Sequence, residues 1–228
     1  MNPTTSQIRP VEDLAGPAGR LEAVLNSGRA DAPLAAVVCH PYPPAGGSLH
    51  NKVVYNAMKA LSALGIPVLR FNFRGVGLSE GSFDGGKGEQ DDVRAAIDWL
   101  DHNLHLPILL VGFSFGSNVG MRACCGDSRV KGLVGLGLPV RAEGRDYTYG
   151  FLPSCTQPKL FICGDHDQFA PRAVMEEVLA NAPEPKRMAW VEGAEHFFQG
   201  VEGSPAPKLA VMQRELQDWV RKQFGLPE

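Results

Sequence analysis

ILLVGFSFGSN, residues 108–118, joins a continuous apolar run to a turn of glycine and serine. The apolar run has the length and composition of a buried β-strand. Gly112, Ser114 and Gly116 form the pattern Gly-x-Ser-x-Gly, which is typical of a sharp strand-to-helix turn at the carboxyl edge of a sheet. Glycine on either side lets the strand and the following helix approach each other. The pattern therefore predicts an α/β fold and indicates Ser114 as a candidate nucleophile.

Apolar runs of strand length alternate with helical segments on both sides of this turn. The predicted strands are Leu21–Leu25, Leu34–Cys39, Pro67–Asn72, Ile108–Phe113, Val130–Leu136, Lys159–Cys163 and Lys186–Val191. The predicted helices are Lys52–Leu64, Glu89–Asp101, Asn118–Cys125, Arg172–Asn181 and Ala206–Phe224. This alternation predicts a doubly wound, mostly parallel sheet with helices on both faces. Since no internal repeat or linker interrupts it, we expect residues 1–228 to form a single domain.

Residues 139–158 depart from the alternation. They contain Gly144, Gly150 and Pro153, which favour a loop or a short excursion. No other stretch could supply a lid, so we expect no large cap domain. Three aromatic residues of this stretch are candidates for the substrate pocket: Tyr147, Tyr149 and Phe151.

The composition is that of an ordinary globular protein, with 44% hydrophobic and 21% charged residues and a formal net charge of -3. Without a run of Lys or Arg, the electrostatic pattern of a nucleic-acid-binding protein is missing. The first residues, MNPTTSQIRPVEDLAG, have no basic region followed by an apolar one, and nowhere do eighteen apolar residues run together. We therefore expect a cytoplasmic protein with neither a nucleic-acid nor a membrane partner.

The chain has five cysteines, an odd number without a Cys-x-x-Cys pair: Cys39, Cys124, Cys125, Cys155 and Cys163. No histidine stands at metal-ligand spacing beside them. We expect buried free thiols. Nothing in the sequence implies a cofactor or a metal.

A serine nucleophile needs a base, and histidine is the expected one. His196 follows the last predicted strand, where the chain order Ser, acid, His of this type of fold puts the base. Between Ser114 and His196, the segment FICGDHDQFAP offers Asp165 and Asp167 as the acid. Asp167 is preferred, because Asp165 adjoins the strand end and could instead cap the turn.

Acyl transfer also needs amide groups that stabilise the developing oxyanion. The Phe115 amide follows the nucleophile at a helix start, where N–H groups are free. In the loop CHPYPPAGGSLHNK, Tyr42 supplies the first amide after His40, since proline has no N–H. Phe115 and Tyr42 are therefore the predicted oxyanion donors. We expect His40 to orient this loop rather than react, and it is a further candidate for the pocket wall.

Six segments in a fixed order resemble one branch of the α/β hydrolases. They are HPYPPAGGSLHNKVV, RFNFRGVGLSEGSFDGG, GEQDDVRAAIDWL, GFSFGS, GDHDQFAP and EHFF. Together they are similar to the small lidless serine hydrolases related to dienelactone hydrolase and to the catalytic domain of prolyl oligopeptidase. The resemblance implies carboxylesterase-type activity and assigns the acid to Asp167, in a Gly-x-x-Asp pattern that begins at Gly164. It also implies an architectural role for Arg74 and Ser79, which we expect to bond loop backbone.

The predicted substrate is a small-molecule ester with a short acyl group, and two alternatives stay open. A peptidase or amidase acting on small acyl-peptides would use the same triad. A noncatalytic binding protein on the hydrolase fold would not need Ser114, Asp167 and His196 in this order. The oligomeric state has no signal in the sequence.

Overall fold

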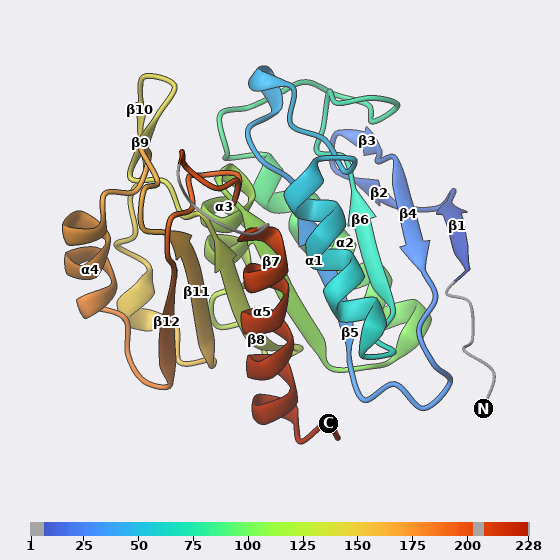
Figure 1. Ribbon diagram of the computed structural model, residues 1–228. Helices are drawn as coiled ribbons and strands as arrows, with labels where there is room; N and C mark the ends of the chain where they lie inside the picture. Colours follow the sequence, from blue (N-terminus) through green and yellow to red (C-terminus); the bar gives the residue numbers. More distant parts are fainter. Residues whose placement is uncertain (1–6, 203–207, 228) are drawn as a thin grey trace.

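The computed structural model describes residues 7–202 and 208–227, and its centre is an eight-stranded sheet (Figure 1). The strand order is β1-β4-β6-β5-β7-β8-β11-β12. The strands are β1 (Ile8–Val11), β4 (Ala23–Asn26), β5 (Ala35–Cys39), β6 (Val68–Phe71), β7 (Ile108–Phe113), β8 (Val130–Leu136), β11 (Lys159–Gly164) and β12 (Lys186–Val191). β4 is antiparallel to β1 and β6, and every other pair is parallel. The predicted fold class is confirmed.

Helices cover both faces of this sheet (Figure 1). One face is covered by α1 (Lys52–Ala63) and α5 (Lys208–Phe224). The other face is covered by α2 (Glu89–Leu104) and α3 (Phe115–Cys124), and α4 (Arg172–Ala180) packs against the same apolar cluster as these two helices. All residues of β5, β6, β7 and β11 are buried, because a parallel sheet between two helical layers has no face open to water. Two apolar clusters, one on each face, form the core.

Most predicted bounds agree with the structure to within two residues. α2 continues three residues beyond its predicted end, to Leu104. α3 begins at Phe115, three residues before the predicted start, because Ser114 itself is the N-cap. β1 was not predicted, since Pro10 weakens the strand pattern; an edge strand tolerates the missing N–H. Two short hairpins were also missed, of which the first is β2 (Ala15–Gly16) with β3 (Gly19–Arg20). Residues 206–207 of the last predicted helix lie outside the described residues.

The second hairpin, β9 (Arg141–Ala142) with β10 (Arg145–Asp146), lies in the excursion of residues 139–158. Glu143 and Gly144 form its turn, with φ of 51° and 71°, the left-handed pair that a two-residue hairpin requires. A short 3₁₀ helix, η2 (Leu152–Ser154), follows. In Figure 1 the hairpin extends beyond β11 and β12 at the upper left. The excursion is short, and the described part of the chain adds no cap domain to the sheet.

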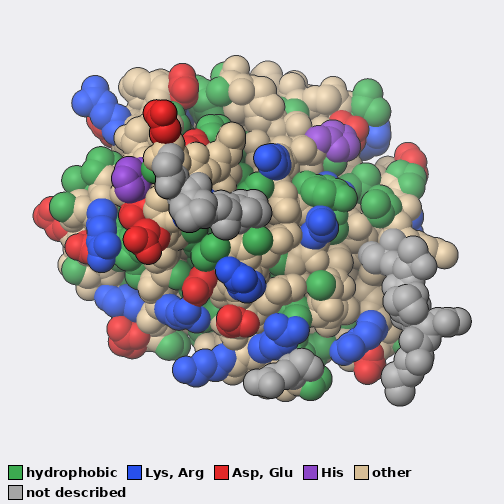
Figure 2. Space-filling view, viewed as in Figure 1, with side chains coloured by type: hydrophobic (Ala, Val, Ile, Leu, Met, Phe, Trp, Pro, Cys, Tyr) green, Lys and Arg blue, Asp and Glu red, His purple; other side chains and the backbone are tan. Residues whose placement is uncertain are grey.

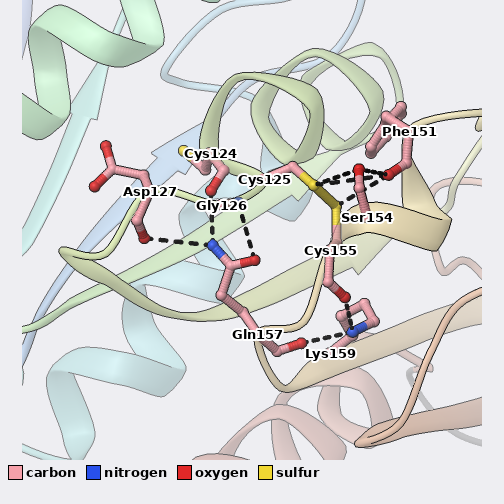
Figure 3. Close-up of a disulfide and its surroundings, with 9 residues drawn as sticks. All are labelled: Cys124, Cys125, Gly126, Asp127, Phe151, Ser154, Cys155, Gln157 and Lys159. Carbon is pink, nitrogen blue, oxygen red and sulfur yellow. Dashed lines mark hydrogen bonds between the residues drawn. A yellow bond between two sulfur atoms is a disulfide. The ribbon is translucent and has the colours of Figure 1, made fainter.

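A disulfide joins this excursion to α3, in contrast to the expectation of free thiols. Cys125, the C-cap of α3, is bonded to Cys155, the C-cap of η2 (Figure 3). The two cysteines are 30 residues apart in the sequence, so no short-range spacing could indicate their pairing. Cys39, Cys124 and Cys163 are free and buried, as expected.

Further bonds hold the segment around Cys155 (Figure 3). The buried Lys159 ammonium donates to the carbonyl oxygens of Cys155, at 2.7 Å, and Gln157, at 2.6 Å. The Gln157 side chain accepts from the Gly126 amide and donates to the Cys124 carbonyl. The end of α3 and the end of the excursion are therefore tied together by a covalent bond and several hydrogen bonds.

The surface on the side of α1 and α5 has no extended patch of one charge. Figure 2 shows Lys and Arg side chains interspersed with Asp and Glu side chains over this face. No helix in the described ranges is long and apolar enough to cross a membrane.

Candidate active site

Ser114 occupies a sharp turn between β7 and α3. Its φ of 53° and ψ of -121° lie in a region that residues other than glycine rarely adopt. A Cβ on Gly116 would lie 2.5 Å from the carbonyl oxygens of Cys39 and His40, and one on Gly112 would lie 2.3 Å from the Gly116 oxygen. Only glycine fits at these two positions, because the neighbouring backbone is too close for a side chain. The turn thereby holds the serine hydroxyl at the carboxyl end of β7.

The structure brings Ser114, His196 and Asp167 together in one chain of hydrogen bonds. His196 Nε2 lies 2.9 Å from Ser114 Oγ, and His196 Nδ1 lies 2.8 Å from Asp167 Oδ2. A carboxylate accepts hydrogen bonds, so Nδ1 carries a proton that it donates to Asp167. In the tautomer that has its proton on Nδ1 alone, Nε2 can accept from the Ser114 hydroxyl. All three residues are buried, with 2% to 6% of their surface exposed.

Three phenylalanines enclose the His196 ring. Phe169 contacts it edge-on with ring centres 4.7 Å apart, and Phe113 and Phe197 lie at 5.1 Å and 5.2 Å. Asp167 is anchored separately, because its Oδ1 accepts from the Phe169 amide at 2.9 Å. These aromatic contacts restrict the rotation of the imidazole.

Asp165, the alternative acid, lies in a different environment. Its Oδ1 accepts from the Gly193 amide at 2.7 Å and contacts His166 Nδ1 at 2.8 Å. Partial burial acts to raise the pKa of the Asp165 carboxyl, but these bonds together outweigh it, so that the pKa is lowered. Asp165 therefore holds the turn after β11 to the segment after β12, and makes no bond to His196.

Two amide groups beside Ser114 form no hydrogen bond with any of the described residues. Phe115 is the first residue of α3, so its N–H has no acceptor within the helix. Tyr42 precedes the 3₁₀ helix η1 (Pro43–Ala45), and its N–H bonds to none of the described residues. The Tyr42 carbonyl accepts from the Gly47 amide at 3.0 Å, which closes the loop tightly. Both amides are available to an oxygen atom near Ser114.

His40 links this loop to the neighbouring strand and does not line the cavity. Its Nδ1 bonds to the Pro41 carbonyl at 2.7 Å, and its Nε2 accepts from the Phe73 amide at 3.0 Å. Burial lowers the pKa of His40 from 6.5 to about 4, because an enclosed imidazolium would lose its hydration. A neutral His40 therefore joins the end of β5 to the end of β6.

A cavity of about 80 Å³ opens at Ser114 and His196. Of the aromatic residues expected in its wall, Tyr147 lines it, whereas Tyr149 is buried with its hydroxyl donating to the Pro139 carbonyl, and Phe151 contacts Arg122 instead. The remaining lining residues are Pro41, Tyr42, Ala45, Gly46, Gly47, Asn51, Ala142, Glu143, Phe169 and Phe197. Sequence reasoning missed Phe169 and Phe197, although each lies within two residues of a predicted site residue.

Arg74 and Ser79 belong to the loop beside the site. The Arg74 guanidinium forms a buried pair with Asp92, at 2.7 Å between Nη2 and Oδ1, where bonding to loop backbone was expected. The pairing raises the pKa of Arg74. The Ser79 hydroxyl does bond backbone, donating to the Asn72 carbonyl and accepting from the Glu22 amide. Within the described ranges, no group of three or more His, Cys, Asp or Glu residues could hold a metal ion.

Comparison with known proteins agrees with this architecture. Residues 36–222 match the family described as an alpha/beta hydrolase domain. An uncharacterized protein of Rickettsia prowazekii is 37% identical over 192 residues, which cover 81% of this chain and 80% of that protein.

Solved structures show the same fold. An α/β serine hydrolase without a lid from Xanthomonas campestris is 35% identical, with a TM-score of 0.80 and coverage of 99% of this chain and 97% of that one. Est1E of Butyrivibrio proteoclasticus, solved with ferulic acid bound, is 15% identical, with a TM-score of 0.75 and coverage of 90% and 96%. The second likeness concerns the fold alone.

Proposed function

The chain belongs to the α/β hydrolase family, and from this premise we propose that it is a serine esterase that cleaves small carboxylic esters at Ser114. The observation that carries the proposal is the unbroken hydrogen-bond chain from Ser114 Oγ through His196 to Asp167, at the wall of a cavity. A nucleophile, a base and a group that orients the base are the parts that covalent acyl transfer requires.

In the proposed reaction, Ser114 Oγ attacks the ester carbonyl while His196 Nε2 takes its proton. The negative charge on the carbonyl oxygen is stabilised by the amides of Tyr42 and Phe115. Nε2 then gives the proton to the departing alcohol, and the bond between carbonyl carbon and alcohol oxygen breaks. Water attacks the acyl-enzyme with Nε2 as base, which releases the acid and restores Ser114. Asp167 keeps the imidazole in the required tautomer throughout.

The size of the cavity favours short acyl groups. About 80 Å³ holds a group of only a few heavy atoms, and the aromatic side chains of Tyr42, Tyr147 and Phe197 form much of the wall. Esters with long acyl chains would leave most of their apolar surface in water. We therefore expect acetate and butyrate esters to be better substrates than octanoate esters.

Hydrolysis of p-nitrophenyl acetate, butyrate and octanoate tests this proposal. Ser114→Ala should lower kcat by at least about 10³-fold. Asp167→Asn should lower it by about 10²-fold to 10⁴-fold, because the imidazole loses the acceptor that sets its tautomer.

Asp165→Asn is the matched control, since it makes the same chemical change two residues away on a carboxylate without contact to His196. It should stay within about threefold of wild type. A folded wild type without turnover, or equal losses in the two Asp variants, would contradict the proposed assignment.

A further inference from the structure

A second cavity, of about 320 Å³, adjoins the catalytic one. Tyr147 lines both, and Phe115, the residue after Ser114, lines the second. Three cations also line the second cavity: Lys87, Arg122 and Arg145. We name it the basic cavity.

Arg145 is held in the basic cavity without a carboxylate. Its guanidinium lies over the rings of Tyr42, Phe83, Phe115 and Tyr147, 5.2 to 5.9 Å from their centres. Nη2 donates to the Gly85 carbonyl at 2.6 Å. Nε and Nη1 bond to none of the described residues. The rings and the carbonyl fix the guanidinium in place, while its charge stays unneutralised and its Nε and Nη1 groups stay free to donate.

Arg122 is held in a similar way. Its guanidinium lies 4.7 Å from the centre of the Phe151 ring, and Nη2 donates to the backbone and side-chain oxygens of Thr148. Other arginines of the molecule, such as Arg74 with Asp92 and Arg129 with Asp127, are paired with acids. The basic cavity therefore gathers two guanidinium groups that form no ion pair with an acid among the described residues.

The nearby carboxylates do not cancel this charge. Asp146 is the one acidic residue among the lining residues that the structure describes, and it lies 3.6 Å from Arg141. Glu89 is buried behind the loop and accepts from the amides of Asp84 and Gly86. Glu143 lines the catalytic cavity instead. An anionic group near Ser114 would thus be repelled from the Glu143 side and attracted toward Arg145.

We propose that the basic cavity binds a carboxylate of the substrate, so that the preferred esters are monoesters that carry a free carboxylate at a distance from the ester group. The inference rests on the proposed esterase function and specifies its substrate class. Free N–H groups of a guanidinium match the two oxygens of a carboxylate, and a positive cavity raises the local concentration of anionic substrates.

The test compares charged and neutral esters that otherwise match. One series consists of monoethyl esters of succinate, glutarate, adipate and pimelate against their diethyl esters. The other consists of acetoxyalkanoates against their methyl esters, which places the charge on the alcohol side. In at least one series and chain length, the ratio of kcat/KM for the charged ester to kcat/KM for the neutral one should exceed about 10 at low salt. It should fall several-fold at high salt because of screening.

Arg145→Gln should lower this ratio at least tenfold, and Arg122→Gln at least threefold. Arg145→Lys keeps the positive charge but loses the planar set of guanidinium N–H donors, so it should give an intermediate ratio. This intermediate result would show that the loss in Arg145→Gln is not caused by misfolding. Arg94→Gln, which removes the same charge from an exposed residue of α2 paired with Asp91, should leave the ratio unchanged.

The outcomes separate this inference from the proposed function. Turnover of neutral esters without any preference for charged ones would overturn the proposed carboxylate binding in the basic cavity, but it would support the proposed esterase activity. If no ester is turned over, titration calorimetry with glutarate and adipate decides. Saturable binding that Arg145→Gln abolishes would support the basic cavity, and its absence in wild type would overturn it.

Discussion

Gly116 lies where the first turn of α3 packs against the end of β5 and the residue that follows it. A methyl group there would come within 2.5 Å of two backbone oxygens, which side-chain movement cannot relieve. We expect Gly116→Ala to lower the free energy of unfolding by about 2 kcal/mol or more, a cost typical of overpacking, and to displace Ser114. Urea unfolding measures the first effect and ester hydrolysis the second.

Gly150→Ala is the control for that substitution. Apart from Gly150 and its two chain neighbours, no described residue has a heavy atom within 4 Å of the position that a Cβ would take there, and the φ of Gly150 is not in the left-handed region. The variant should stay within about 1 kcal/mol of wild type. Equal stability of the two variants would mean that the close approach at Gly116 does not exist in solution.

His40 makes stability depend on pH. Its pKa is lowered from 6.5 to about 4 in the folded protein, so the unfolded chain binds a proton more readily. The contribution of His40 to the free energy of unfolding is fully present above about pH 6.5. It is lost progressively as the pH falls to about 4, and the total loss is about 3 kcal/mol. His40→Gln removes the titration while keeping an acceptor. The difference in unfolding free energy between wild type and variant should change over this range, and a constant difference would contradict the assignment.

The residues around Ser114 differ in how far the sequence could predict them. Ser114, Asp167 and His196 follow β7, β11 and β12, and carboxyl ends of parallel strands share one edge of a sheet. The strand order therefore predicts that these three side chains lie close to one another. Arg145 and Glu143 belong to a hairpin of two-residue strands, which is too short for a periodic pattern. Nothing local in the sequence points these two side chains toward the site.

The excursion of residues 139–158 is the element on which both cavities depend, and the Cys125–Cys155 disulfide anchors it to α3. Because the two cysteines are 30 positions apart, loss of the crosslink should cost about 3.6 kcal/mol, mainly by freeing the unfolded chain. Dithiothreitol should lower the Tm of wild type and leave that of a Cys125→Ser/Cys155→Ser double variant unchanged. Five reactive thiols in the unfolded, non-reduced protein would contradict the crosslink.

The disulfide also bears on the expected cytoplasmic location, which stays a prediction. Structural disulfides persist in oxidising compartments and are rare in the cytosol of most organisms. Among the other elements, long buried strands such as β7 were predicted with the correct bounds because an apolar run of strand length has few alternatives. The pairing of distant cysteines depends on the tertiary fold and could not be predicted in this way.

For the molecule as a whole, the single domain expected for residues 1–228 stays a prediction. Trp190 lies in the sheet, on β12, whereas Trp99 on α2 and Trp219 on α5 belong to the two helical layers that cover it. We expect tryptophan fluorescence and far-ultraviolet circular dichroism to report the same urea midpoint, as in a two-state transition. Two separate midpoints would indicate independently folding parts.

The proposed esterase mechanism depends on a nucleophilic Ser114, and reaction with a fluorophosphonate followed by intact-mass and peptide analysis is its most direct test. We predict one adduct per chain, located on Ser114 and absent from Ser114→Ala. A folded wild type that forms no adduct, or an adduct that persists in Ser114→Ala, would contradict the role of Ser114 as the nucleophile.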